Sequence, residues 1–98
     1  MCSYKGGSWS SWQDVDEEVK NICSKVKPCV EEKTRESFTI FEPLTFRSQV
    51  VKGMNYDIVL YTGKQTCLQM RVWQDVAPVK LNVMSIAVFP LLTVSIKT

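Results

Sequence analysis

Residues 38–72 read FTIFEPLTFRSQVVKGMNYDIVLYTGKQTCLQMRV, and the spacing of apolar residues in this stretch decides the fold. Apolar and polar side chains alternate with a period of two, which is typical of β-strands with one buried face. Three strands are expected, with apolar faces made of Phe38, Ile40, Leu44, Phe46 and Val50, then Tyr56, Ile58 and Leu60, then Leu68, Met70 and Val72. Because Glu42-Pro43 breaks the first alternation, we expect a bulge or bend there.

Turn residues separate these strands, and a fourth strand follows them. Thr62-Gly63-Lys64-Gln65 predicts a turn between the second and third strands. Beyond residues 75–78, Val79, Leu81 and Val83 alternate with polar residues and predict the fourth strand. The apolar tract of residues 83–96 is too short to span a bilayer and is interrupted by proline, so we interpret it as strand or tail.

A helical pattern precedes the strands. Apolar residues recur there mainly at spacings of three and four, which predicts one amphipathic helix. Its apolar stripe consists of Val15, Val19, Ile22, Cys23, Val26 and Val30. Ser11 and Asp14 match a capping box, so Ser11 is the expected N-cap. Pro28 cannot donate to the carbonyl of Ser24, which predicts a kink or an early end, and the continuation of the stripe favours the kink. Residues 33–37 are the expected connecting loop.

The helix stripe and the strand faces need each other for burial. The sequence therefore predicts an α+β fold, in which an antiparallel β-sheet of four to five strands is wrapped around one long α-helix. The 98 residues are expected to form a single domain, 1–98, with a mobile arm at residues 1–11 and a C-terminal segment at residues 83–98.

Composition excludes several classes of function. The net charge of +2 is too small to indicate a nucleic acid or a membrane as partner, and we interpret the scattered basic residues, Arg47 and Arg71 among them, as a solvated surface. The chain has no histidine, no phosphate-binding loop and no facing carboxylate pair, so no enzyme, metal or cofactor is expected. Trp9 and Trp12 fit either a ligand-stacking pair or packing of Trp12 at the helix start.

Cysteine usage and the first residues indicate a reducing compartment. Residues 1–12 contain no apolar run that could serve as a secretory signal, so we expect a cytoplasmic protein. The four cysteines, Cys2, Cys23, Cys29 and Cys67, form no CxxC pair and are expected to be free, inert thiols.

The segment Gln49-Val50-Val51-Lys52-Gly53 is unusual for a hairpin connection. Tight turns favour Asn, Asp or Gly, whereas here two β-branched valines stand at or near the tip. One interpretation is a projecting apolar loop that forms a binding surface. The other places both valines within the strand and the turn at Lys52-Gly53-Met54-Asn55.

This segment resembles the QxVxG motif of the cystatin superfamily, and its surroundings resemble the stefin branch of that family. Further matches are Gly6-Gly7, Val26-Lys27-Pro28, Glu31-Glu32-Lys33-Thr34, Phe46-Arg47-Ser48, Asn55-Tyr56 and Leu68-Gln69-Met70-Arg71-Val72-Trp73. The resemblance runs from about Gly6 to Asp75. Departures from the stefin pattern are Lys52, the loop at Val76-Ala77-Pro78 and the segment from residue 83 onward.

The resemblance implies a reversible, non-covalent, tight-binding inhibitor of papain-like cysteine proteases such as the cysteine cathepsins. Three parts would occupy the protease cleft: the arm with Gly6 and Gly7, the hairpin formed by Gln49, Val50, Val51, Lys52 and Gly53, and the loop formed by Val76, Ala77 and Pro78. A monomer is expected, and opening of the valine hairpin would permit a domain-swapped dimer. The alternative is a cystatin-fold interaction module without inhibitory activity.

Overall fold

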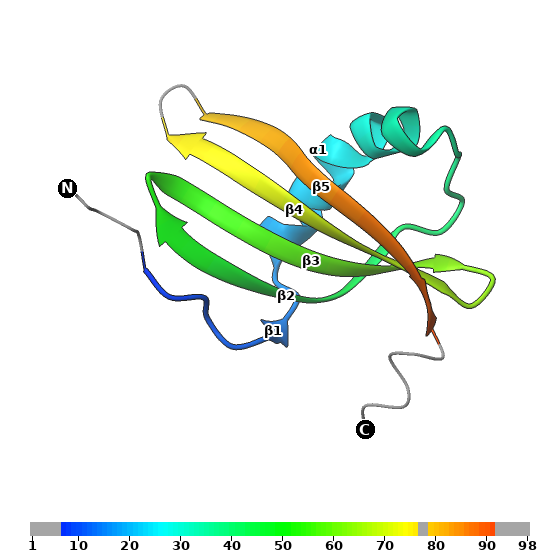
Figure 1. The fold of residues 1–98 in the computed structure, drawn as a ribbon, viewed down its shortest axis with the longest axis horizontal. Helices are drawn as coiled ribbons and strands as arrows, with labels where there is room; N and C mark the ends of the chain where they lie inside the picture. Colours follow the sequence, from blue (N-terminus) through cyan, green and yellow to red (C-terminus); the bar gives the residue numbers. More distant parts are fainter. Residues whose placement is uncertain (1–6, 77–78, 92–98) are drawn as a thin grey trace.

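The computed structural model of the protein describes residues 7–76 and 79–91 (Figure 1). One helix packs across a five-stranded antiparallel sheet whose strands follow the order β1-β2-β3-β4-β5. The elements are β1 Gln13–Asp14, α1 Glu17–Thr34, β2 Glu42–Val51, β3 Gly53–Gly63, β4 Thr66–Val76 and β5 Val79–Pro90. This arrangement confirms the predicted α+β fold with a sheet of four to five strands around one helix.

The start of α1 differs from the predicted one. Asp16, not Ser11, is the N-cap, and its side chain accepts a hydrogen bond of 2.9 Å from the backbone N–H of Val19. The predicted capping box was wrong because Asp14 belongs to β1, where Gln13 and Asp14 gain backbone partners on β2. Asp16 accepts from the N–H three residues ahead, which has no partner within the helix; this is the ordinary role of an N-cap carboxylate.

The rest of the helix follows the sequence pattern. All members of the predicted stripe are buried except Val15, which packs at its margin, and α1 continues through Pro28. Pro28 and Ser24 lie on the exposed side, where water can satisfy the carbonyl that proline leaves without a donor. The helix ends at Thr34, one residue after the expected start of the loop, with Arg35 in the left-handed conformation (φ 60°).

The apolar faces of β3 and β4 are buried as predicted, whereas that of β2 is buried only in part. The buried residues of β3 and β4 on the helix side are Tyr56, Ile58, Leu60, Leu68, Met70 and Val72. The first strand was expected to include Phe38 and Ile40, but both precede β2; Phe38 is still buried, whereas Ile40 is 41% exposed. Within β2 only Phe46 is buried; Leu44 and Val50 are 42% and 58% exposed. A register shift between Pro43 and Thr45 confirms the predicted bulge region and turns Leu44 out of the core. Val50 is exposed because it lies at the end of the β2–β3 hairpin.

The turns and the last strand are also largely as expected. Lys64 and Gln65 form the β3–β4 turn with positive φ at both residues, 55° and 57°. The fourth predicted strand is β5, which extends beyond Val83 to Pro90, so the first part of the C-terminal segment is regular strand. Val79, expected on the apolar face, is 66% exposed because it lies at the start of this edge strand.

Cys23 is a buried thiol on the core side of α1, and Cys23, Cys29 and Cys67 are free, as expected. Cys2 lies outside the described residues. Burial raises the pKa of Cys23 from 9.0 to about 12. Burial, together with the nearby charges of Glu18 and Asp16, also raises the pKa of Tyr56 above its usual 10.0.

These raised pKa values predict a loss of stability at alkaline pH. Between about pH 9 and pH 12 the unfolded chain releases the Cys23 proton and the folded chain keeps it, so unfolding becomes more favourable as pH rises. The free energy of unfolding should fall by about 1.4 kcal/mol per pH unit for each such group within its window. Urea denaturation from pH 7 to 11 measures the slope, and Cys23→Ala should reduce it. A slope in Cys23→Ala that equals that of the unchanged chain would contradict the prediction.

Candidate functional site

The β2–β3 hairpin ends in a tip of residues 50–53 that is braced against β4. Val51 and Gly53 are paired across Lys52, so both valines belong to the strand, as the second interpretation held. Its turn at Lys52-Gly53-Met54-Asn55 was wrong, because β3 already begins at Gly53. Val50 is nevertheless 58% exposed. The indole Nε1 of Trp73 donates a hydrogen bond of 2.9 Å to the carbonyl of Lys52. The tip therefore projects apolar valine side chains from a strand end whose backbone is held by the hydrogen bond to Trp73 and by pairing with β3.

Gly53 is required by the geometry of this tip. Its φ of 96° lies in the region that side chains disfavour, and a Cβ there would overlap the carbonyl oxygen of Gln74. The same Cβ would stand 3.1 Å from the Nε1 of Trp73. Glycine thus permits the close approach of the tip to β4.

Gln49 joins three segments through its side-chain amide. Its Nε2 donates to the carbonyl of Gly7 at 3.0 Å, and its Oε1 accepts from Asn55 Nδ2 at 3.0 Å. The backbone N–H of Gly7 donates to the carbonyl of Val50 at 2.6 Å. The structure therefore brings Gly7 of the arm directly beside the hairpin tip.

Gly7 is not needed for packing within the chain itself. A Cβ at Gly7 would lie 3.6 Å from the carbonyl oxygen of Val50, an ordinary contact. Gly6 lies outside the described residues, and the mobility of residues 1–11 stays a prediction, although Gly7 and Ser10 are hydrogen-bonded to β2.

The end of β4 and the start of β5 lie at the same end of the sheet as the tip and the arm (Figure 1). Val76, the last residue of β4, and Val79, the first residue of β5, are 60% and 66% exposed. Ala77 and Pro78 lie outside the described residues. Of the predicted site residues, the structure thus brings together Gly7, residues 49–53 and Val76 along one edge of the molecule.

A cluster on the opposite face of the sheet from α1 was not predicted. The Asp57 cluster consists of Trp9, Trp12, Arg47, Asp57 and Arg71. Arg47, Asp57 and Arg71 are direct cross-strand neighbours on β2, β3 and β4. Arg47 and Arg71, interpreted from the sequence as part of a solvated surface, are partly exposed, but the register also pairs both with one buried carboxylate. The sequence shows that these three charged residues occupy the polar face of their strands. Their contact could be predicted only with the correct strand register.

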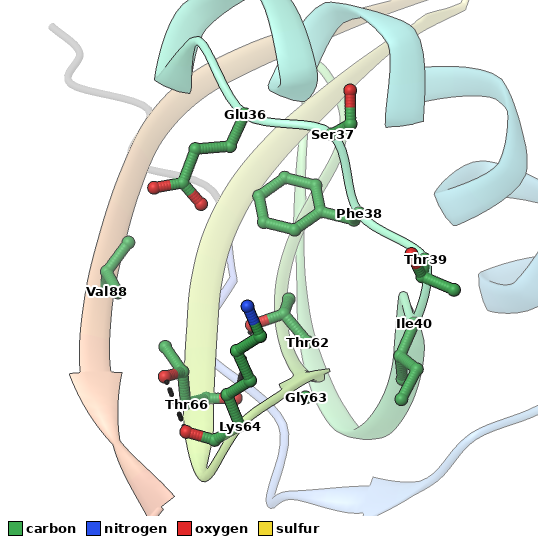
Figure 2. A pocket seen from close by; sticks show the side chains of 10 residues that line it. All are labelled: Glu36, Ser37, Phe38, Thr39, Ile40, Thr62, Gly63, Lys64, Thr66 and Val88. Carbon is green, nitrogen blue, oxygen red and sulfur yellow. Dashed lines mark hydrogen bonds between the residues drawn. The ribbon is translucent and has the colours of Figure 1, made fainter.

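An open depression of about 710 Å³ lies at the far end of β3 (Figure 2). It is lined by the segment before β2, including Phe38 and Ile40, by the β3–β4 turn and by Val88 of β5. Its charged residues are Glu36 and Lys64. Since β3 has 11 residues, this depression is roughly 30 Å from the tip, so it shares no residue with the candidate site.

Within residues 7–76 and 79–91, no group of three or more histidine, cysteine or acidic residues is placed to hold a metal ion. No helix in the described part of the chain is long and apolar enough to cross a membrane.

Comparisons with known proteins show which family this chain is similar to. The family model of the cystatin domain matches residues 7–85. Leukocyte cysteine proteinase inhibitor 1 of Sus scrofa is 43% identical over 58 residues, which are 59% of this chain and 56% of that protein. Stefin-C of Bos taurus is 38% identical over 69 residues, 70% of this chain and 68% of that protein. Cystatin-B of Homo sapiens is 35% identical over 69 residues, 70% of each chain.

The first of these matches spans little more than half the length of the pig protein. The family match also bears out the expectation that this chain is not an enzyme. Because the cystatin domain model covers most of the chain and its relatives include stefins, this chain belongs to the cystatin family and to its stefin branch.

Proposed function

We propose that this chain is a reversible, non-covalent, tight-binding inhibitor of papain-like cysteine proteases. The observation that carries the proposal is the exposed Val50 on a tip braced by Gly53 and Trp73. An apolar side chain held rigidly in water gains free energy when a complementary groove covers it. The name of the relative from Sus scrofa, a cysteine proteinase inhibitor, supports the same class of partner.

The inhibitor would act by occupying the cleft without reacting. The tip enters the middle of the cleft, the arm with Gly6 and Gly7 lies on one side, and the loop of Val76, Ala77 and Pro78 rests on the other. Such a complex buries roughly 1,600 Å² in total, as other protease–inhibitor pairs do. Affinity comes from the preformed edge, since few side chains have to be ordered on binding.

We place this activity in the cytoplasm, with cysteine cathepsins as partners and a monomer as the active form. The resemblance to stefins and the free thiols support this placement. A domain-swapped dimer would require the β2–β3 hairpin to open, which breaks the Trp73–Lys52 hydrogen bond.

Titration of papain with the purified chain tests the proposal. We expect loss of papain activity at or below micromolar concentration and recovery of activity on dilution. Removal of residues 1–8 should weaken inhibition by roughly tenfold or more, because the arm no longer covers its side of the cleft. Undiminished papain activity with a folded chain at micromolar concentration would instead indicate a cystatin-fold interaction module.

A further inference from the structure

Asp57 is a buried carboxylate on the sheet face that α1 does not cover. Its exposed fraction is 1%, and two arginines on the neighbouring strands satisfy it. Arg71 donates from Nε to Oδ1 at 2.7 Å and from Nη2 to Oδ2 at 3.0 Å. Arg47 donates from Nε to Oδ2 at 3.1 Å and lies 3.0 Å from it through Nη2. Such charge-assisted, bidentate pairs fix the guanidinium planes.

The carboxylate brings the two guanidinium groups to one aromatic ring. Arg47 and Arg71 stand on β2 and β4, whose backbones are roughly 9.5 Å apart. Even so, the guanidinium carbons of both lie 4.8 Å from the ring centroid of Trp9. Arg47 also lies 4.9 Å from the ring of Trp12. Two like charges approach one ring this closely because Asp57 lies between them and neutralises part of their charge.

Trp9 belongs to the segment that runs along the free edge of β2. Trp9 and Gln49 form an antiparallel bridge, and the N–H of Ser10 donates to the carbonyl of Ser48 at 2.8 Å. Ser10 Oγ accepts from the N–H of Ser48 at 3.0 Å. The hydrogen bond from Gly7 to Val50 continues this pairing to the hairpin tip. The segment of residues 7–10 is thus held by a few backbone bonds, by hydrogen bonds of the Ser10 and Gln49 side chains, and by one ring on two guanidinium groups.

We infer that Asp57 is a positioning residue for protease binding: by holding Arg47 and Arg71 against Trp9, it fixes residues 7–10 beside the hairpin tip. This inference rests on the proposed function and deepens it. The Asp57 cluster lies on the sheet face opposite α1, and through it the arm and the hairpin tip, two parts of the proposed protease-binding surface, are aligned. The arm then meets the protease already aligned with Val50, and less conformational freedom is lost on binding. In the described part of the chain, the side-chain hydrogen bonds of Asp57 go to Arg47 and Arg71.

Amide hydrogen exchange of the full chain tests the positioning role directly. In Asp57→Asn and in Trp9→Ala, exchange of the Gly7 and Ser10 amides should accelerate by roughly tenfold, the loss expected for a desolvated cation–π and ion-pair contact. Trp9→Phe keeps an aromatic face and should remain near the wild-type rates. The amides of Ile58 and Met70 report on the sheet core and should not change in Trp9→Ala. If Asp57→Asn loosens the core as well, Trp9→Ala, which leaves the sheet intact, decides the result.

Inhibition of papain by the same variants tests the functional consequence. Asp57→Asn and Trp9→Ala should each weaken inhibition by roughly tenfold, and the double variant should be no weaker than Trp9→Ala, because both act through one contact. Unchanged Gly7 and Ser10 exchange in either variant, or additive losses in the double variant, would overturn the role of Asp57 while wild-type inhibition persists. A wild-type chain that leaves papain active would overturn the proposed function and this role together.

Discussion

Replacement of Gly53 by alanine is expected to weaken inhibition of papain by roughly 100-fold, because the new Cβ forces the hairpin tip away from β4. The Cβ would overlap the Gln74 carbonyl and crowd the Trp73 indole that holds Lys52. Since β4 is a central strand, the tip has to move. The position of Val50 relative to Gly7 and Val76 would then change. The strained φ alone should also lower the free energy of unfolding by about 1–3 kcal/mol.

Gly63→Ala is the matched control for this substitution. Gly63 has a similar φ of 90° and lies at the opposite end of β3, but the atoms nearest to its Cβ would belong to the Ile40 side chain, the closest at 3.4 Å. Both variants therefore carry the same kind of backbone strain, whereas Gly53→Ala alone disturbs the tip. Inhibition titrations and urea denaturation of both variants separate stability from binding. Equal inhibition by the two variants would show that the geometry of the tip does not determine binding.

Replacement of Val50 by aspartate is expected to lower affinity for papain by at least roughly 100-fold without unfolding the chain. Val50 is already 58% exposed, so a carboxylate there remains solvated in the free protein. In the complex the same carboxylate would be buried in the middle of the cleft without a partner, which costs several kcal/mol. The circular dichroism spectrum should match that of the unchanged chain.

Val88→Asp provides the same chemical change at a site remote from the edge. Val88 is 61% exposed on β5 and lines the depression at the other end of the sheet (Figure 2). The Val88→Asp variant should inhibit papain as strongly as the unchanged chain does. A Val50→Asp protein that retains full inhibition would mean that the hairpin tip does not enter the cleft.

The sequence alone determined the helix, its buried stripe and the order of the main strands. Periodicity suffices for this, because a side chain's face follows from its position along a helix or strand. The stripe from Val19 to Val30 and the buried positions of β3 and β4 are examples. The resemblance to stefins added the motif at residues 49–53, which the structure places beside Gly7 and near Val76.

Only the tertiary structure decided the contacts that depend on register and on the path of the arm. The N-cap of α1 is Asp16 and not the predicted Ser11, because Gln13 and Asp14 pair with β2, which is far away in the sequence. Arg47, Asp57 and Arg71 are separated by 10 and 14 positions and meet only because three strands align in one register. Local patterns fix which face a side chain takes, whereas the partner across the sheet is set by loop lengths, bulges and the packing of the whole chain.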